Sequence, residues 1–262
     1  MRFPIETLSF DLVDDIRLAV DNGDLSLGDL PAIKTQSIGA FLELAHVLPI
    51  DSGPQHWLHD NRFQPVLRAK KNVERCYLDS GLHLGFVPVE EFNNDETIET
   101  EFYIRARRAV AFAGFQKAEA AQFVAATVEL YSNVIEHSGS AAGAYVAFAA
   151  YENCFEFVVA DTGIGLLESL KSNPKYDGLD DSGSALELAL TEGVSRHAGN
   201  SGRGRGVRPI FVGLANVSDS LRFRSGDHVR ELRRLEDGSI PAVTRQKSQL
   251  PGFFAPFAVL LD

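Results

Sequence analysis

Apolar positions follow regular periods most clearly in the second half of the chain. Spacings of three and four residues over 101–112 and 117–137 predict two helices, of which the second is the longer. The apolar runs 144–151 and 154–160 are separated by Glu152–Asn153, a pair that suits a two-residue β-hairpin. The remaining predicted strands are 220–225, 228–235 after a turn at Gly226–Asp227, and 253–261. This order predicts an α+β fold in which helices cover one face of a mixed, mostly antiparallel sheet.

The first half of the chain has a weaker pattern. Helical spacing is present over 38–48 and 66–78, and 82–89 resembles a strand. An acidic, asparagine-containing stretch at 90–97 lacks apolar periodicity. We therefore predict two domains. These are a small α/β domain over 1–95 that offers a regulatory or interaction surface, and a larger domain over 96–262.

Composition narrows the classes of partner. The chain has 262 residues, with 36 acidic against 25 basic side chains and a formal net charge of −11. This balance argues against broad attraction to nucleic acid or to an anionic membrane surface. Cys76 and Cys154 lack the spacing of a metal site, and no apolar run approaches the roughly 18 residues of a membrane span. The start of the chain lacks the apolar run of a signal peptide, so we expect a cytoplasmic protein.

The helix predicted over 117–137 carries the first candidate site. Glu129 and Asn133 are four residues apart and therefore project from one helix face, about one turn from each other. A carboxylate beside an amide oxygen suits Mg²⁺, and the carboxylate could also accept a proton from water or a hydroxyl. Taken alone, however, the pair favours an ordinary solvated helix face.

A glycine-containing turn forms the second candidate site. Asp161-Thr162-Gly163-Ile164-Gly165 follows directly after an apolar strand. The Asp161 carboxylate can accept a hydrogen bond from an exocyclic amine, and the two glycines allow backbone to approach a ligand closely. The alternative is an ordinary aspartate–glycine loop.

A glycine–arginine segment forms the third. Gly202-Arg203-Gly204-Arg205-Gly206 precedes an apolar stretch that could open a helix. Backbone N–H groups there favour phosphate, and the two arginines could add charge-assisted contacts. One alternative is a flexible surface loop. An RNA-binding segment is another, although it lacks interleaved aromatic residues.

The order of the three sites resembles that of the GHKL superfamily of ATPases and kinases, over about 101–262. In that family the N, G1 and G2 boxes follow one another in the same way. The segment ELYSNVIEHSG at 129–139 is similar to the anti-sigma-factor serine kinases and to stand-alone histidine-kinase-like ATP-binding proteins. RFRSG at 222–226 and LPGFFAPF at 250–257 lie where the family has its closing strands. The resemblance implies a two-layer α/β sandwich of Bergerat type.

The resemblance also implies roles for individual residues. Asn133 would coordinate the Mg²⁺ that bridges the phosphates of ATP, Glu129 would act as general base, and Asp161 would bind the adenine amino group. His137 would lie beside the nucleotide as a helix-end histidine rather than as a phosphoacceptor, and 166–201 would form a mobile lid. The other residues implied to line the nucleotide site are Gly163, Gly165, Gly202, Arg203, Gly204, Arg205 and Gly206.

These implications predict a Mg-ATP-binding cytoplasmic regulatory protein that transfers phosphate to a serine or threonine of a partner protein. Two alternatives remain open. One is a slow conformational ATPase, which could form a homodimer. The other is a nucleotide-gated binding module without catalysis. The chain lacks a Walker A lysine motif and a GxGxxG fingerprint, which disfavours P-loop and Rossmann sites.

Overall fold

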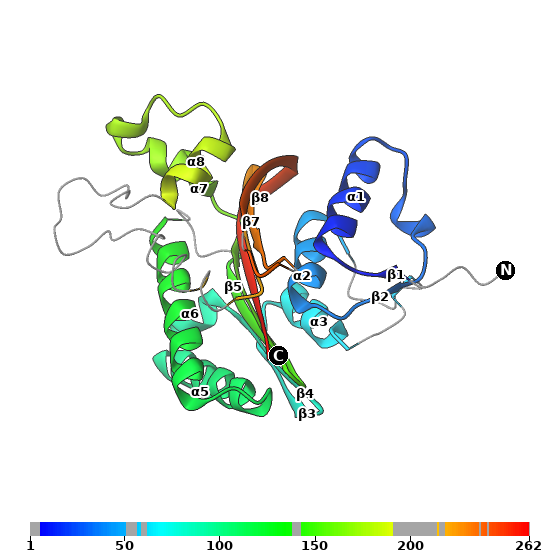
Figure 1. The fold of residues 1–262 in the computed structure, drawn as a ribbon, viewed down its shortest axis with the longest axis vertical. Helices are drawn as coiled ribbons and strands as arrows, with labels where there is room; N and C mark the ends of the chain where they lie inside the picture. The colour runs from blue at the N-terminus through cyan, green and yellow to red at the C-terminus, as the bar shows by residue number, and fades with distance from the viewer. Residues whose placement is uncertain are drawn as a thin grey trace.

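A six-stranded antiparallel sheet organises the molecule (Figure 1). The computed structural model describes residues 6–50, 57–58, 62–137, 143–190, 214, 218–235, 237–239 and 241–261, without the side chains of 93 and 133–137. The strands are β3 (Cys76–Ser80), β4 (Leu82–Pro88), β5 (Tyr145–Tyr151), β6 (Cys154–Asp161), β7 (Ser220–Arg233) and β8 (Ala242–Leu260). Their order across the sheet is β3-β4-β5-β6-β8-β7. The predicted α+β class is confirmed.

One face of the sheet is covered by helices that follow β4 and β6. They are α4 (Val89–Asn94), α5 (Glu96–Phe112), α6 (Lys117–His137), α7 (Gly165–Lys171) and α8 (Ser182–Ala189). Phe123 of α6 stacks on Phe155 of β6 with ring centroids 6.1 Å apart, in an aromatic core beneath the helices. The two predicted helices are confirmed. The first of them begins at Glu96, because the Asp95 carboxylate accepts a hydrogen bond from the Thr97 N–H, 2.8 Å away, and caps the helix.

The helices of 96–262 thus lie on one face, as predicted, and the N-terminal helices cover the opposite face. These helices are α1 (Phe10–Asp21), α2 (Ile38–Val47) and α3 (Gln64–Asn72), with the short turn η1 (Leu27–Asp29) and the parallel strands β1 (Glu6–Thr7) and β2 (Ile33–Lys34) beside them. In Figure 1 the sheet is seen nearly edge-on between these helices and α5 to α8. The physical reason is that β5 and β6 are apolar on both faces, and such strands need cover on both sides.

The predicted boundary between 95 and 96 separates two strands from the rest of their sheet. β3 and β4 lie on the N-terminal side of it, yet β4 pairs with β5 from His83–Ala150 to Pro88–Tyr145. Side chains of β4, β5, β6 and β8 share one hydrophobic core with α1, α2 and α3. The N-terminal helices therefore form a layer on the sheet.

The turn predicted at Gly226–Asp227 is wrong. β7 continues through it as one strand and pairs with β8, with a register shift on either side of Gly226. Gly226 has a φ of +60°, and a Cβ there would lie 2.1 Å from the Ser182 hydroxyl at the start of α8. The glycine therefore serves as a bulge under a helix rather than as a hairpin turn.

A cluster of buried charges joins the N-terminal helices to the sheet. Arg222 and Arg224 of β7 are 1% and 0% exposed and point to the face that α1 and α2 cover. The Arg222 guanidinium lies 2.9 Å from both the Asp14 and the Glu43 carboxylates, and Arg224 also pairs with both. Glu231 pairs with Arg222 from the same strand. Because each charge is removed from water, the loss of any one partner would leave an uncompensated buried charge and destabilise the fold.

Among the residues described, no helix combines the length and the hydropathy needed to cross a bilayer.

Candidate functional site

Asp161 lies at the end of β6, on the sheet face that carries α6. Side chains alternate along a strand, so Asp161 shares a face with Phe157 and Val159, which belong to the core under α5 and α6. The Asp161 side chain is nearly inaccessible, since the residue is 2% exposed. A carboxylate buried to this degree is unusual without a charged partner, and it marks the place as a candidate binding site.

Two opposing effects set the pKa of Asp161. Burial raises it from 3.8 to about 6, while hydrogen bonds from the backbone N–H groups of Gly163 and Phe253 lower it. The Gly163 N–H lies 2.7 Å from the carboxylate. The carboxylate is ionised at neutral pH, at a cost to the folded state of about 3 kcal/mol that is present above pH 6 and absent below pH 3.8. A group kept charged at the expense of stability is typical of a functional site.

Two glycines allow close packing of backbone near Asp161: Gly252 packs on Asp161 itself, and Gly165 packs on Gly252 and Ser225. Gly252 of β8 has a φ of +70°, and a Cβ there would lie 2.1 Å from the Asp161 carbonyl oxygen. Gly165 has a φ of +76° at the start of α7, where a Cβ would lie 3.3 Å from the Gly252 carbonyl oxygen. At both positions a larger residue would displace the backbone that holds the carboxylate.

The Ser225 hydroxyl forms hydrogen bonds that connect β7 to β8 and to α7. Ser225 of β7 is 1% exposed, and its Oγ donates to the Gly252 carbonyl oxygen at 2.8 Å. The Ser225 Oγ also accepts a hydrogen bond from the Leu166 N–H at 2.9 Å. β7, β8 and the first turn of α7 thus meet beside Asp161. Sequence reasoning did not assign roles to Ser225 or Gly252, although both occur in the two segments noted for the closing strands.

The structure describes part of the predicted N box. Glu129 is exposed on α6, the helix that packs on β6 through the stacked rings of Phe123 and Phe155. The helix that carries Glu129 therefore covers the sheet face to which the Asp161 side chain belongs. Asn133 and His137 lie on the last turns of α6, and their side chains are outside the described part of the structure.

The predicted phosphate-binding residues fall outside the described residues. They are Gly202, Arg203, Gly204, Arg205 and Gly206. Within the described part of the chain, no group of three or more histidine, cysteine, aspartate or glutamate side chains could hold a metal ion. The roles of these glycines, of the arginines and of Asn133 stay predictions.

The first part of the predicted lid is folded. Residues 165–190 form α7, the short turn η2 (Pro174–Tyr176) and α8, which share a hydrophobic cluster of Leu170, Tyr176, Ala185 and Ala189. Asp181 caps α8, its carboxylate accepting the Ser184 N–H at 2.8 Å. Up to residue 190 the predicted lid is therefore packed through its own side chains. The rest of the predicted lid, 191–201, lies outside the described residues.

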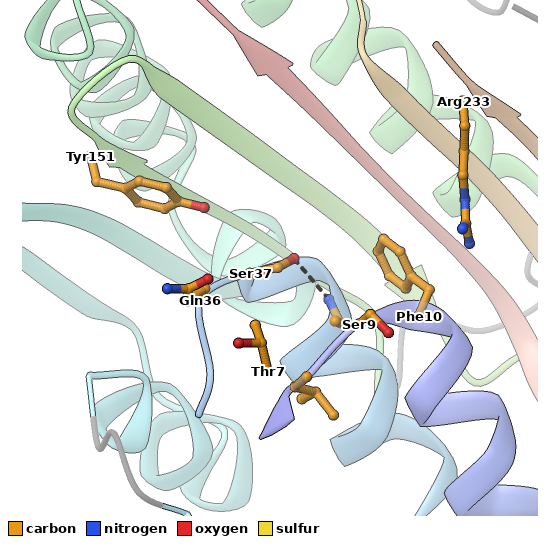
Figure 2. A pocket seen from close by; sticks show the side chains of 9 residues that line it. Thr7, Ser9, Phe10, Gln36, Ser37, Tyr151 and Arg233 are labelled. Atoms are coloured by element: carbon orange, nitrogen blue, oxygen red, sulfur yellow. Dashed lines mark hydrogen bonds between the residues drawn. The ribbon is translucent and has the colours of Figure 1, made fainter. Parts of the chain in front are cut away.

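A cavity of about 300 Å³ lies apart from these residues, near the starts of α1 and α2 (Figure 2). Figure 2 shows Ser37 and Tyr151 on its wall, with the Ala40 N–H hydrogen-bonded to Ser37. The hydroxyls of both wall residues donate to the buried Glu156 carboxylate, which also accepts the Gly39 N–H at 3.1 Å. The other lining residues are Thr7, Leu8, Ser9, Phe10, Gln36, Ala40 and Arg233. Ser37 and Glu156 thus cap α2, and the Tyr151 hydroxyl holds the Glu156 carboxylate.

No protein-family model, curated protein or solved structure matches the chain.

Proposed function

We propose that the chain is a Mg-ATP-binding regulatory protein of Bergerat type that transfers phosphate to a serine or threonine of a partner protein. The order of elements supports the proposal. A long helix with Glu129 and Asn133 is followed by the β5–β6 hairpin, by the glycine turn after Asp161 and by the closing strands β7 and β8. We place this protein in the cytoplasm, in keeping with its two free cysteines, Cys76 and Cys154.

The environment of Asp161 is the observation that carries the proposal. Its ionised carboxylate is buried and accepts the backbone N–H groups of Gly163 and Phe253. A carboxylate of this kind accepts a hydrogen bond from the exocyclic amine of adenine. Guanine has a carbonyl oxygen at the same position. That oxygen and the carboxylate are both acceptors, so they cannot form a hydrogen bond with each other. We therefore infer selectivity for ATP over GTP.

Residues outside the adenine pocket would hold the phosphates and Mg²⁺. Asn133 would supply an oxygen ligand to Mg²⁺, with His137 beside the nucleotide. Backbone N–H groups of 202–206 would bind phosphate, and Arg203 and Arg205 would offset its charge. When bound, ATP supplies a transferable phosphoryl group.

Glu129 would accept the proton of the attacking hydroxyl. It lies exposed on α6, where a partner's side chain can reach it. Loss of this proton acceptor should slow transfer while leaving nucleotide binding in place, because the adenine pocket and the phosphate segment do not include Glu129.

We therefore expect Glu129→Gln to bind Mg-ATP with wild-type affinity and to lose phosphate transfer by about 100-fold or more. Transfer is measured with γ-labelled Mg-ATP and a dephosphorylated protein extract, as labelled phosphoserine and phosphothreonine. Glu152→Gln, at the exposed β5–β6 turn, is the matched control and should behave as wild type. Labelled product at the wild-type rate in Glu129→Gln would refute the role of this carboxylate. Phosphate release without any partner, lost in the same variant, would instead favour the ATPase.

A further inference from the structure

His46 of α2 connects the N-terminal helices to the strand beside Asp161. Its Nε2 lies 3.0 Å from the carbonyl oxygen of Pro251 in β8. A carbonyl oxygen can only accept a hydrogen bond, so Nε2 carries the proton. The other ring nitrogen, Nδ1, lies 3.4 Å from the Tyr145 hydroxyl, which can donate to it. With the Tyr145 hydroxyl donating to Nδ1, the ring is neutral and carries its proton on Nε2.

The residues after Pro251 hold Asp161 in place. Gly252 packs on the Asp161 carbonyl group, as its φ of +70° and its absent Cβ allow. The Phe253 N–H donates to the Asp161 carboxylate. A shift of the Pro251 peptide would therefore move one of the two backbone donors that stabilise the charged carboxylate.

A second contact from the N-terminal layer fixes the same segment. The Arg224 guanidinium donates to the Ser248 carbonyl oxygen at 2.8 Å. Arg224 is itself paired with Glu43, which lies on α2 with His46. The helix thus holds the segment 248–253 at two points, once directly and once through Arg224.

We propose that His46 is a positioning residue of the nucleotide site, and that the N-terminal helical layer sets the adenine pocket by holding 248–253 against Asp161. This inference rests on the proposed function. It gives the N-terminal layer a defined role, since any partner that moved α2 would change the geometry around Asp161.

The surroundings of His46 agree with its role as a neutral hydrogen-bond donor to Pro251. Burial and the nearby charges of Lys70 and Arg224 lower the pKa of His46 to about 4, so the ring stays neutral around neutral pH. Lys70 is held by the Ala45 carbonyl oxygen at 3.1 Å. The Phe254 ring lies against His46 with centroids 5.6 Å apart, and the buried Tyr145 hydroxyl lies on its other nitrogen. Tyr145 also interacts electrostatically with Asp161.

The test compares two substitutions of His46. His46→Phe keeps an aromatic ring against Phe254 and Tyr145 but cannot donate to Pro251, whereas His46→Gln retains an N–H donor. The pKa of Asp161 is measured from its side-chain carboxyl carbon by NMR titration, and Mg-ATP affinity is measured by calorimetry. His83→Phe, at a partly exposed histidine of β4, is the matched control.

In His46→Phe we expect the pKa of Asp161 to rise above about 6, because the Phe253 donor is displaced. Mg-ATP affinity should fall about 3- to 10-fold, and His46→Gln should recover both quantities. An Asp161 pKa and an affinity that stay at wild-type values in folded His46→Phe would overturn the proposal. If His46→Phe does not fold, His46→Met replaces it with the same expectations.

The two proposals can fail separately. A wild-type protein that does not bind Mg-ATP would refute the proposed function. The NMR titration would still decide the structural part of the inference, because it reports on Asp161 without any nucleotide.

Discussion

Gly252→Ala is expected to abolish Mg-ATP binding and to lower the free energy of unfolding by about 2–4 kcal/mol. Two physical costs add. A φ of +70° is unfavourable for alanine, and its Cβ would lie 2.1 Å from the Asp161 carbonyl oxygen, which forces backbone to move. The displaced strand also takes with it the Phe253 N–H that stabilises the ionised carboxylate. The measurements are urea-induced unfolding and Mg-ATP calorimetry.

Two other glycines separate these costs. Gly238 has a φ of +79°, and a Cβ there would meet no atom within 4 Å, so Gly238→Ala isolates the backbone strain. Gly178 has open space and no positive φ, so Gly178→Ala should be nearly neutral. An unfolding free energy for Gly252→Ala no lower than that of Gly238→Ala, with nucleotide binding intact, would show that close packing on Asp161 is unimportant.

Arg224→Met is expected to destabilise the protein by about 3–5 kcal/mol, because it removes one member of a network of buried charges. Arg224 is 0% exposed and pairs with Asp14 and Glu43, which are themselves buried. Removing the guanidinium leaves both carboxylates with less compensating charge in a poorly solvated place. It also removes the hydrogen bond to the Ser248 carbonyl oxygen. Chemical denaturation at neutral pH measures the loss.

An exposed ion pair provides the control for this prediction. Arg75 lies 3.5 Å from Glu91 and its side chain is 45% exposed, so Arg75→Met should cost less than about 1 kcal/mol. The double variant Arg224→Met with Glu43→Leu removes one positive and one negative charge. It should recover part of the free energy of unfolding, because the buried Glu43 carboxylate is no longer left without compensating charge. Equal losses in Arg224→Met and Arg75→Met would contradict the view that the cluster is a buried network.

Local signals in the sequence predict the elements around the candidate site well. The pair Glu152–Asn153 forms the turn between β5 and β6, and Asn153 takes a positive φ of 62°, which asparagine tolerates better than most residues. The helical periods of α5 and α6 and the strand before Asp161 are confirmed. These elements depend on residues close together in the chain, which is why periodicity finds them.

Long-range relations are what periodicity misses. The apolar character of β5 and β6 on both faces indicates cover on both sides, but it does not say which helices provide it. Gly226–Asp227 has the composition of a turn, and the bulge there depends on Ser182 of α8, which no local pattern indicates.

The sequence predicts only the part of the candidate site that is continuous in the chain, because the rest depends on long-range contacts. Asp161 and the glycines after it form one continuous motif. Ser225 contacts Leu166 across 59 residues, and His46 contacts Pro251 across 205 residues. Contacts of this kind exist only once the sheet has formed, so the residues that support Asp161 become visible in the structure rather than in the sequence.

Titration of Mg-ATP and Mg-GTP into wild type and Asp161→Asn by calorimetry tests the nucleotide site most directly. The substitution keeps the size of the side chain and removes a charge whose burial costs stability, so the variant should unfold no more easily than wild type at a pH well above the pKa of Asp161. We predict that wild type binds Mg-ATP more tightly than Mg-GTP and that folded Asp161→Asn binds neither measurably. Equal affinity of wild type and Asp161→Asn for Mg-ATP, or no binding by folded wild type, would contradict an adenine pocket at Asp161.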